Sequence, residues 1–417
     1  MRATIGITVL CVGIAASACQ DSPQATSPQS GRSGPDQVVI HARLKITPRD
    51  GAGRVKPSTP ITVRAVDATL TAVTVRSAGQ LLGDQPPASG SEWRSRALLH
   101  TSSRYTVEAT AVDAAGKTVT ATSSFRTLTP ENTVRATIFQ GLNQTYGVGM
   151  PIMITFSSPV ANKRAVERAI ELRSSTPVIG SWYWDGDSTL DFRPRNYWPA
   201  NTTVHFVANL DGVETAPGIY AVHTLSQTFR IGRSLIAVAS TTHHRVRIYL
   251  DHKLFGDWPM SSGKPGDDTP NGTYLSIEKH NPEEMKGPGY DISVPWSVRF
   301  TWSGDYLHDA FWSVGQQGFE NVSHGCINLS PANAETYYKL SVPGDPVTVT
   351  GSPRGGMWGN GWTVWFLGWK ELLAGSALHR AVRVGPDGSA FVKPGNLHGH
   401  TKPAPLGAPS PGNSEPA

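Results

Sequence analysis

The sequence predicts a mainly β protein made of several sheet-rich units in one chain. Three observations support this prediction: the 417 residues include 42 Gly and 32 Pro, only 17% of the residues are charged, and many apolar residues alternate with polar ones in short runs. Short alternating runs separated by Gly and Pro are typical of strands joined by turns, not of long helices. The length allows two to four domains.

The charge of the chain is modest, with a formal net value of +5. No run of Lys and Arg is dense enough to indicate nucleic-acid binding, so no nucleic-acid partner is expected. The charge favours solubility or attraction to an anionic envelope.

The N-terminus, residues 1–19, has the layout of a secretory signal. Arg2 precedes an apolar run that ends near Ala16, and small residues follow up to Cys19. The run is too short to span a bilayer stably. The ending ASAC resembles a bacterial lipobox, with Ala16 where that pattern usually has Leu, and implies that Cys19 is lipidated and anchors the mature protein. Ordinary cleavage after Ala18, without lipidation, is the alternative.

Residues 20–36 are rich in Ser, Pro, Gln and Gly and are expected to form a flexible linker. Two strand-rich units follow, at 37–130 and 131–232, and we predict that both are immunoglobulin-like (Ig-like) β-sandwiches. In the first, Asp113–Lys117 (DAAGK) is expected to form a hairpin turn. In the second, Asn162 is expected to cap a short helix. Neither unit contains clustered His, Cys or paired carboxylates, which predicts a spacing or docking role.

The third unit, residues 233–352, again alternates short strands with Gly/Pro-rich turns. One helix is expected to begin at Pro331 with Ser330 as its N-cap. Residues 353–383 are rich in Trp and are expected to pack on this third unit, because their Gly residues disfavour a free helix at a membrane interface. Residues 384–417 are rich in Pro and Gly, and a disordered tail is expected there.

The stretch NVSHGCINLS contains Cys326, one of three cysteines in the chain. If Cys11 is removed with the signal and Cys19 is acylated, Cys326 has no disulfide partner, and a zinc site built on several thiolates is excluded. A lone cysteine is often only a small buried apolar residue. The polar neighbours Ser323 and His324 favour a reactive thiol instead.

A reactive thiol needs a base, because a cysteine with an ordinary pKa near ~8.5 is mostly protonated at neutral pH. Two histidines are candidates. His324 lies two residues before Cys326, and His308 lies further upstream in GDYLHDAFW. The spacing in the sequence leaves both open.

The stretch HDAFWSVGQQGFENVSHGCINLS resembles the active-site signature of the L,D-transpeptidases, bacterial cell-wall enzymes with a YkuD-type catalytic domain. Their pattern has a His, a gap, then Ser or Thr followed by His-Gly-Cys, and Asn one residue later. The stretch SSGKPGDDTPNGTY resembles an upstream strand and loop of the family. Two Ig-like units and a Trp-rich C-terminal segment resemble its actinobacterial members.

The resemblance implies that Cys326 is the nucleophile and His308 the general base, oriented by the backbone carbonyl of Asp309. His324 would shape the pocket, and Gly325 would let the backbone approach closely, with the N–H groups of Gly325 and Cys326 facing an oxyanion. Many actinobacterial members have Ser at the position of Asp309, whose carboxylate would bring negative charge near the imidazole. The substrate-contacting positions implied are Tyr290, Ser323, Asn328 and Asp309. Neither a metal nor another cofactor is implied.

The activity implied is two-step acyl transfer between peptidoglycan stem peptides, a donor tetrapeptide and an acceptor. Release of D-Ala would give a thioester, and an amine of the acceptor would then form a 3→3 cross-link. Carbapenem-type β-lactams would be covalent inhibitors, and the protein would face the cell wall from its lipid anchor in the cell membrane.

Several alternatives remain at this point. Water as the acceptor would give an L,D-carboxypeptidase, and a degenerate catalytic unit would give a non-catalytic peptidoglycan-binding lipoprotein. His308, His324 and Cys326 would be zinc ligands in a metal-site hypothesis. A papain-like protease is disfavoured because its Cys precedes its His, whereas here His308 comes first.

Overall fold

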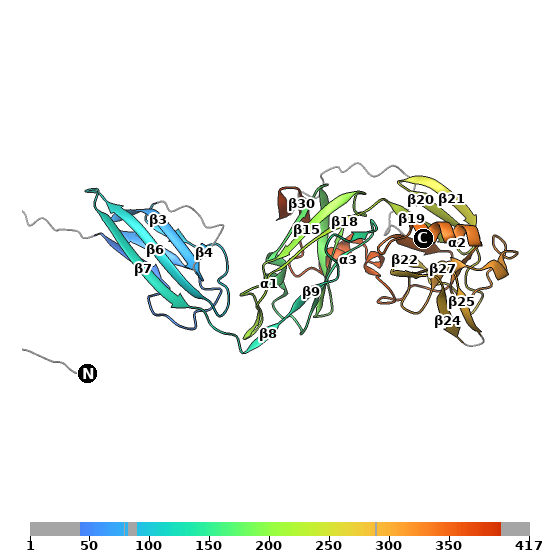
Figure 1. The fold of residues 1–417 in the computed structure, drawn as a ribbon, viewed down its shortest axis with the longest axis horizontal. Helices are drawn as coiled ribbons and strands as arrows, with labels where there is room; N and C mark the ends of the chain where they lie inside the picture. Colours follow the sequence, from blue (N-terminus) through green and yellow to red (C-terminus); the bar gives the residue numbers. More distant parts are fainter. Residues whose placement is uncertain (1–41, 79, 82–89, 288–289, 393–417) are drawn as a thin grey trace, which may run out of the picture. The chain divides into compact units, whose positions relative to one another are not determined.

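The computed structural model describes residues 42–78, 80–81, 90–287 and 290–392 (Figure 1). The expected signal with Cys19, the linker and most of the expected tail lie outside these residues. Strands dominate the described chain, so the prediction of a mainly β fold is confirmed. None of the helices in the described ranges is both long and apolar enough to cross a membrane.

The first sandwich contains two antiparallel sheets whose facing sides are apolar. Val63, Val107 and Phe125 alternate with exposed residues along their strands and are almost fully buried between the sheets. The expected turn after Asp113 is present, because the Asp113 carboxylate accepts hydrogen bonds from the N–H groups of Ala115 and Lys117. One sheet has the order β1 (Arg43–Thr47), β2 (Thr62–Val66), β5 (Glu92–Arg94), and the other β4 (Gln80–Leu81), β3 (Ala68–Ser77), β6 (Arg104–Asp113), β7 (Thr118–Arg126).

The second sandwich has a core of large aromatic side chains, including Trp182 and Trp198. Helix α1 (Lys163–Arg168) begins after Asn162, whose side chain accepts from the Ala165 N–H as expected. Its sheets are β10 (Thr145–Tyr146), β18 (Leu225–Ile231), β15 (Thr202–Ala208), β12 (Ile170–Ser174); β31 (Gly388–Phe391), β30 (Val382–Gly385), β13 (Val178–Asp185), β14 (Thr189–Pro194), β11 (Ile152–Phe156), β9 (Ala136–Ile138); and β16 (Glu214–Ala216), β17 (Ile219–Ala221), β8 (Asn132–Val134).

The hairpin β30–β31 differs from the sequence prediction, which begins a disordered tail at residue 384. Strand β30 pairs with β13, and the side chains of Val382 and Val384 are buried in the core of the second sandwich. The alternation of these two valines around Arg383 is a strand pattern, and the turn residues that follow close a hairpin. Pro and Gly here mark a turn within a sheet.

The Trp-rich segment also differs from its prediction, because it contacts the second sandwich as well as the catalytic unit. Phe366 packs edge-on against Tyr274 of the catalytic unit, with ring centroids 5.1 Å apart. On the other side, the Trp365 indole donates to the Gly149 carbonyl at 2.7 Å, and the buried Arg193 guanidinium lies 4.2 Å from the Trp365 ring. Within the segment lie η2 (Val364–Phe366) and α3 (Trp369–Ala374).

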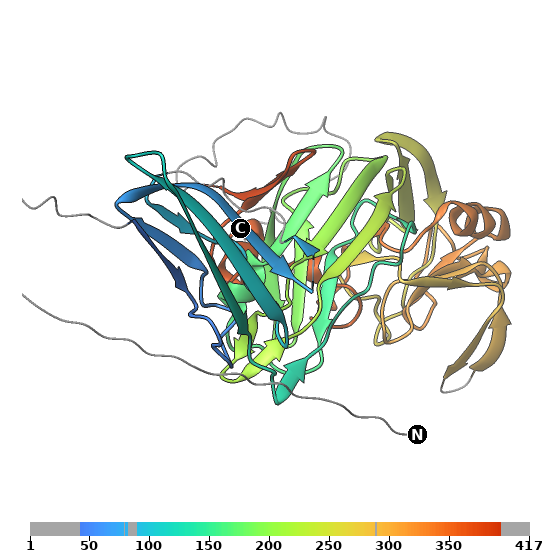
Figure 2. The same ribbon diagram turned by 60° about the vertical axis from the view of Figure 1, so that its left-hand side comes forward.

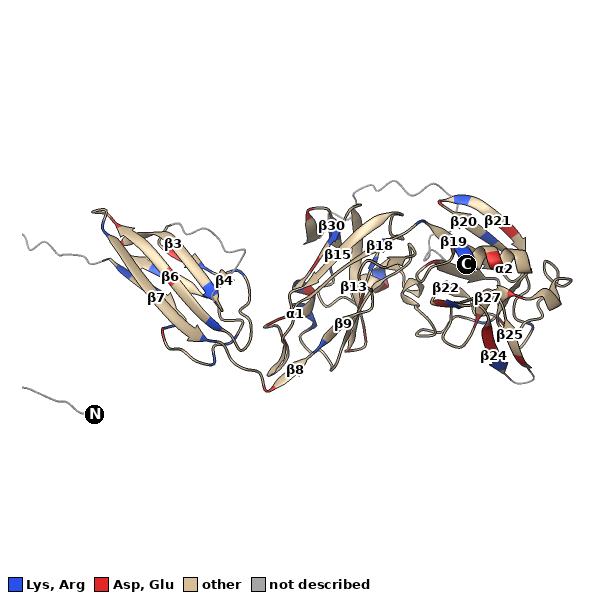
Figure 3. Ribbon diagram, in the orientation of Figure 1, with Lys and Arg blue, Asp and Glu red and all other residues tan. Residues whose placement is uncertain are grey.

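The catalytic unit contains two sheets, a separate hairpin and one helix packed on them (Figure 2). Helix α2 (Pro331–Leu340) begins at Pro331 with Ser330 as N-cap, as expected, and buries Ala334 and Tyr337. Basic and acidic residues are interspersed along the strands, without one long stripe of a single sign (Figure 3). The sheets are β21 (Lys253–Pro259), β20 (Arg245–Leu250), β19 (Leu235–Ser240), β29 (Pro346–Thr350), β22 (Gly272–Leu275); β23 (Glu278–His280), β26 (Ser297–Arg299), β27 (Tyr306–Asp309), β28 (Ile327–Leu329); and the hairpin β24 (Glu283–Gly287), β25 (Tyr290–Val294).

Candidate active site

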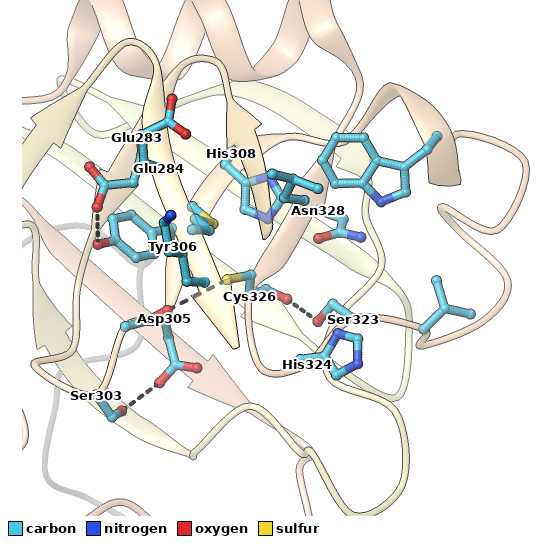
Figure 4. A pocket seen from close by; sticks show the side chains of 16 residues that line it. Glu283, Glu284, Ser303, Asp305, Tyr306, His308, Ser323, His324, Cys326 and Asn328 are labelled. Atoms are coloured by element: carbon cyan, nitrogen blue, oxygen red, sulfur yellow. Dashed lines mark hydrogen bonds between the residues drawn. The ribbon is translucent and has the colours of Figure 1, made fainter. Parts of the chain in front are cut away.

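Two neighbouring parallel strands bring the expected nucleophile and base together. His308 lies in β27, and Cys326 immediately precedes β28, which pairs with β27 so that His308 is opposite Asn328. Between the two strands the chain forms a loop that includes the short helix η1 (Phe311–Ser313). Figure 4 shows the side chains of His308 and Cys326 next to each other in one pocket.

The pocket has a volume of about 390 Å³. Its walls come from the hairpin β24–β25, from the end of β27 and from the SHGC segment, so both polar and apolar groups reach the thiol. Its lining residues are Glu283, Glu284, Met285, Lys286, Ile292, Ser303, Gly304, Asp305, Tyr306, His308, Trp312, Val322, Ser323, His324, Cys326 and Asn328.

The His308 imidazole is buried and held in one tautomer. Its Nδ1 lies 2.7 Å from the backbone carbonyl oxygen of Asp309, and because a carbonyl only accepts, Nδ1 carries the proton. Nε2 is therefore left as an acceptor. Burial lowers the pKa of His308 to about 4, so the ring is neutral at pH 7. The Trp312 ring lies nearly parallel to it, with centroids 6.0 Å apart.

The Cys326 thiol is partly exposed to the pocket and is protonated at rest. Burial, followed by the negative charge of Asp305, raises the pKa of Cys326 to about 12. The Sγ–H group points to the Gly304 carbonyl oxygen at 3.7 Å. A neutral thiol thus faces a neutral imidazole. The pair resembles a nucleophile with its general base more than a preformed thiolate–imidazolium pair.

Gly325 and Ser323 fix the backbone around the thiol. Gly325 has φ +129°, and a Cβ at this position would clash with Asp305 Oδ1, so a glycine is required. The Ser323 hydroxyl donates to the Cys326 carbonyl at 2.6 Å and accepts from the Gly325 N–H at 3.2 Å. The Gly325 N–H, one of the two donors expected at an oxyanion, is therefore already hydrogen-bonded.

A protein named L,D-transpeptidase 5 from Mycobacterium tuberculosis is 35% identical to this chain over 349 residues, which cover 81% of this chain and 77% of that protein. The chain belongs to the L,D-transpeptidase family. L,D-transpeptidase 2 of the same species is 29% identical over 383 residues, covering 89% of this chain and 94% of that protein. This L,D-transpeptidase is therefore an enzyme of the same class.

Two sequence families match parts of this L,D-transpeptidase. The family described as the YkuD L,D-transpeptidase catalytic domain matches residues 233–349, and the bacterial Ig domain matches residues 52–214, which include parts of both sandwiches. Among solved structures, an L,D-transpeptidase in complex with imipenem is 34% identical, with a TM-score of 0.46, and covers 53% of this chain and 100% of that chain. An L,D-transpeptidase from Mycobacterium smegmatis is 31% identical, with a TM-score of 0.43, and covers 52% of this chain and 99% of that one.

Asn328 and Asp309 of this L,D-transpeptidase face different environments. The Asn328 side chain lines the pocket, and its Nδ2 donates to Ser313 Oγ at 2.9 Å, which ties β28 to η1. The Asp309 carboxyl is buried; its Oδ1 has no hydrogen-bond partner among the described residues, and burial raises its pKa. The shift of the His308 pKa comes from burial and from the Asp309 carbonyl, not from the Asp309 carboxylate. The charge expected beside the imidazole therefore does not act there.

His324 and Tyr290 are less deeply placed. His324 is exposed at the pocket, and its Nε2 lies 3.0 Å from Lys264 Nζ. Tyr290 begins β25 and pairs with Gly287, and its side chain lies outside what the structure describes. Over the described parts of residues 42–392, the structure contains no group of three or more His, Cys, Asp and Glu side chains that could hold a metal ion.

Sequence reasoning assigned no role to Thr269, although the residue lies in a stretch that resembles the family. Thr269 is almost fully buried, donates to the Gly325 carbonyl at 2.6 Å and accepts from the Gly263 N–H at 2.9 Å. The segment around Gly263 also runs beside Ser323 as a parallel bridge. Thr269 therefore connects the SHGC turn to a segment far away in the sequence. A threonine followed by Pro270 in an otherwise exposed-looking loop was the only available signal.

Proposed function

We propose that this L,D-transpeptidase forms 3→3 cross-links in peptidoglycan through a thioester on Cys326. The observation that carries the proposal is the neutral Cys326–His308 pair in one pocket, with His308 Nε2 free of the Asp309 hydrogen bond and able to accept a proton. A weak nucleophile beside an oriented base is the arrangement that covalent catalysis requires.

In the first step, Cys326 Sγ attacks the carbonyl carbon that joins the third residue of a donor tetrapeptide to its terminal D-Ala. The thiol proton passes to His308 Nε2 as the S–C bond forms. The C–N bond then breaks, and His308 returns the proton to the departing D-Ala amine. A buried imidazolium with a pKa of about 4 gives up its proton readily, which favours this second transfer.

In the second step, the side-chain amine of the acceptor's diamino acid attacks the thioester. His308 takes a proton from this amine, the C–S bond breaks, and the proton returns to Cys326 Sγ. The new amide is the 3→3 cross-link. Because the Gly325 N–H already donates to Ser323 Oγ, the Cys326 N–H is the remaining member of the expected pair for the oxyanion.

The roles of the surrounding residues follow from their contacts. Asp309 acts through its backbone carbonyl, which holds the His308 tautomer. Asn328 and Ser323 hold the backbone that carries the nucleophile, and both line the pocket where the stem peptide would lie. His324 lies at the pocket mouth and Tyr290 on the hairpin at its edge, and we assign both to substrate contact.

The deciding experiment incubates the purified full-length protein with a disaccharide-tetrapeptide and follows the products by mass spectrometry. Loss of D-Ala with formation of a dimer that carries a 3→3 bond supports the proposal. D-Ala loss with only a shortened monomer indicates an L,D-carboxypeptidase. No change in the substrate indicates a binding protein without this activity.

We also propose that carbapenem-type β-lactams acylate Cys326. The partly exposed thiol beside His308 offers a strained lactam carbonyl the same attack as the stem amide. Intact-mass analysis should show a single adduct that is absent in Cys326→Ala. An unmodified mass at high drug excess would contradict an accessible acyl-transfer site.

For localisation we propose a lipid anchor at Cys19, with the catalytic unit facing the cell wall. The support is the ASAC ending after an apolar run, and bacterial lipoproteins carry more than one acyl chain, which anchors a protein stably. Cells that express the wild type should show it in membranes, labelled by a fatty-acid probe, and Cys19→Ala should abolish both. Unlabelled wild type in the medium would indicate ordinary cleavage after Ala18.

A further inference from the structure

A patch of large apolar side chains is exposed beside the pocket. Phe311, Trp312, Val314 and Phe319, here called the aromatic rim, have exposed fractions of 65%, 47%, 47% and 82%. All four lie in the loop between β27 and β28. Exposed apolar patches next to a catalytic site often mark a surface that binds a ligand.

The backbone of this loop is fastened to the catalytic unit, so the exposure does not come from a loose segment. Ser313 is buried and accepts from Asn328 Nδ2 at 2.9 Å. The Gly318 N–H donates to the Met260 carbonyl at 2.9 Å. With Ser313 and Gly318 held inward, the rim side chains between and beside them are directed to solvent, at a cost that folding alone does not explain.

The rim is continuous with the pocket through Trp312. This residue lines the pocket, lies nearly parallel to His308, and makes an edge contact with Phe311 at 5.1 Å between ring centroids. A substrate that enters the pocket and extends beyond it on this side would meet Phe311 and then the rest of the rim.

We propose that the aromatic rim binds the sugar rings of the glycan to which the stem peptide is attached. The inference rests on the proposed peptidoglycan substrate and extends it to a saccharide subsite. The C–H faces of sugar rings pack on aromatic rings, and the half-buried Gln316 and the exposed Glu320 offer hydrogen-bond partners for hydroxyl groups. Residues 310–322 contain no Lys or Arg, which disfavours an anionic lipid surface as the occupant.

The test compares two substrates of the full-length protein, a disaccharide-tetrapeptide and the same tetrapeptide without sugar. For Phe319→Ala and Phe311→Ala we expect KM for the sugar-bearing substrate to rise about tenfold with kcat unchanged. Turnover of the free tetrapeptide should stay at the wild-type level. Phe319→Tyr should keep the wild-type KM, and Phe319→Leu should behave like Phe319→Ala if a ring is required.

Leu142→Ala is the matched control, because Leu142 is also 64% exposed and belongs to the second sandwich. It should leave both substrates unaffected. An equal loss for both substrates in the Phe variants would overturn the saccharide subsite, because the change would then act on the pocket itself. An unchanged KM in these variants would overturn it as well.

A binding measurement separates this inference from the proposed reaction. Sedimentation of full-length Cys326→Ala with insoluble peptidoglycan, and competition by stem-free glycan fragments, needs no turnover. Weaker sedimentation after Phe319→Ala, together with competition by the glycan, supports the rim even if the wild type releases no D-Ala. If Phe319→Ala instead lowers only binding to lipid vesicles, or only self-association in sedimentation velocity, the rim serves another partner and the proposal fails.

Discussion

The first sandwich and the catalytic unit are built from similar strands but bury different side chains. Strands β3 and β6 have ten residues each, and the core between the sheets consists of apolar residues such as Val75 and Tyr105. Strands β27 and β28 have four and three residues, and they bury His308, Asp309 and Asn328. Burying polar groups costs free energy unless they are hydrogen-bonded. The sandwich is therefore stabilised mainly by burial of apolar area, whereas the catalytic unit depends on the geometry of individual polar contacts.

The largest effect that separates the two regions is expected at the nucleophile. Cys326→Ala should reduce D-Ala release by at least about 10⁴-fold, since removing a nucleophile removes the covalent route. The melting temperature should stay close to that of the wild type, because the thiol makes only one long hydrogen bond, to Gly304. The measurement is D-Ala release together with thermal unfolding. Substantial residual turnover in the variant would remove Cys326 from the mechanism.

The next largest effect is expected at the base. His308→Ala should slow acylation by a carbapenem about 10²–10⁴-fold, the usual contribution of general base catalysis. His324→Ala is the internal control: this side chain is exposed and contacts Lys264, and a smaller effect is expected. Stopped-flow acylation kinetics measure both variants. If His324→Ala is the slower of the two, the base is assigned to the wrong histidine.

The pH dependence tests the state of the same imidazole. A general base must be unprotonated, and burial lowers the pKa of His308 to about 4. The second-order acylation rate constant of the wild type should therefore stay level as pH falls from 7 to about 5, then drop about tenfold per pH unit below 4. An exposed histidine with an ordinary pKa would give the fall near pH ~6.5. A half-maximal rate near that pH would show that His308 is more solvated than the structure indicates.

The sequence predicted the catalytic pair from a short motif, because a His, a Gly and a Cys in a polar segment carry a chemical signal of their own. It also predicted the helix starts at Asn162 and Ser330, where a polar cap precedes the helix. The hairpin β30–β31 was missed, because its Pro and Gly residues were taken as disorder and only pairing with β13 shows their role. Likewise, the contact of Thr269 with Gly325 joins segments 56 residues apart, and no local pattern encodes such a distance.

Two glycines sharpen the comparison of the two regions. Gly116 in the first sandwich has φ +81° and open space where a Cβ would lie, whereas Gly325 has φ +129° and faces Asp305 Oδ1. Gly116→Ala should lower the free energy of unfolding by about 1 kcal/mol, the cost of a positive φ, and leave acylation unchanged. Gly325→Ala should cost about 1–3 kcal/mol and slow acylation up to about 100-fold, because the thiol is displaced. Chemical denaturation and carbapenem acylation test both; equal acylation rates would contradict a steric role for Gly325.

The smallest effect is expected from removing one buried hydroxyl in each region. Ser123 Oγ in the first sandwich donates to the Pro48 carbonyl at 2.8 Å, and Thr269 Oγ1 in the catalytic unit donates to the Gly325 carbonyl at 2.6 Å. Loss of either bond leaves a buried carbonyl or N–H unsatisfied, so Ser123→Ala and Thr269→Val should each lower the free energy of unfolding by about 1–3 kcal/mol.

Their effects on catalysis should differ, because only Thr269 supports the turn that carries Cys326. Thr269→Val should slow acylation by less than Gly325→Ala does, since it loosens the SHGC turn without a steric clash. Thr269→Ser, which keeps the hydroxyl, should restore most of the rate, and Ser123→Ala should match the wild type. A rate loss in Ser123→Ala would mean that stability alone limits acylation. A wild-type rate in Thr269→Val would mean that the remaining contacts of the turn, such as the Ser323 bond to the Cys326 carbonyl, hold the thiol in place by themselves.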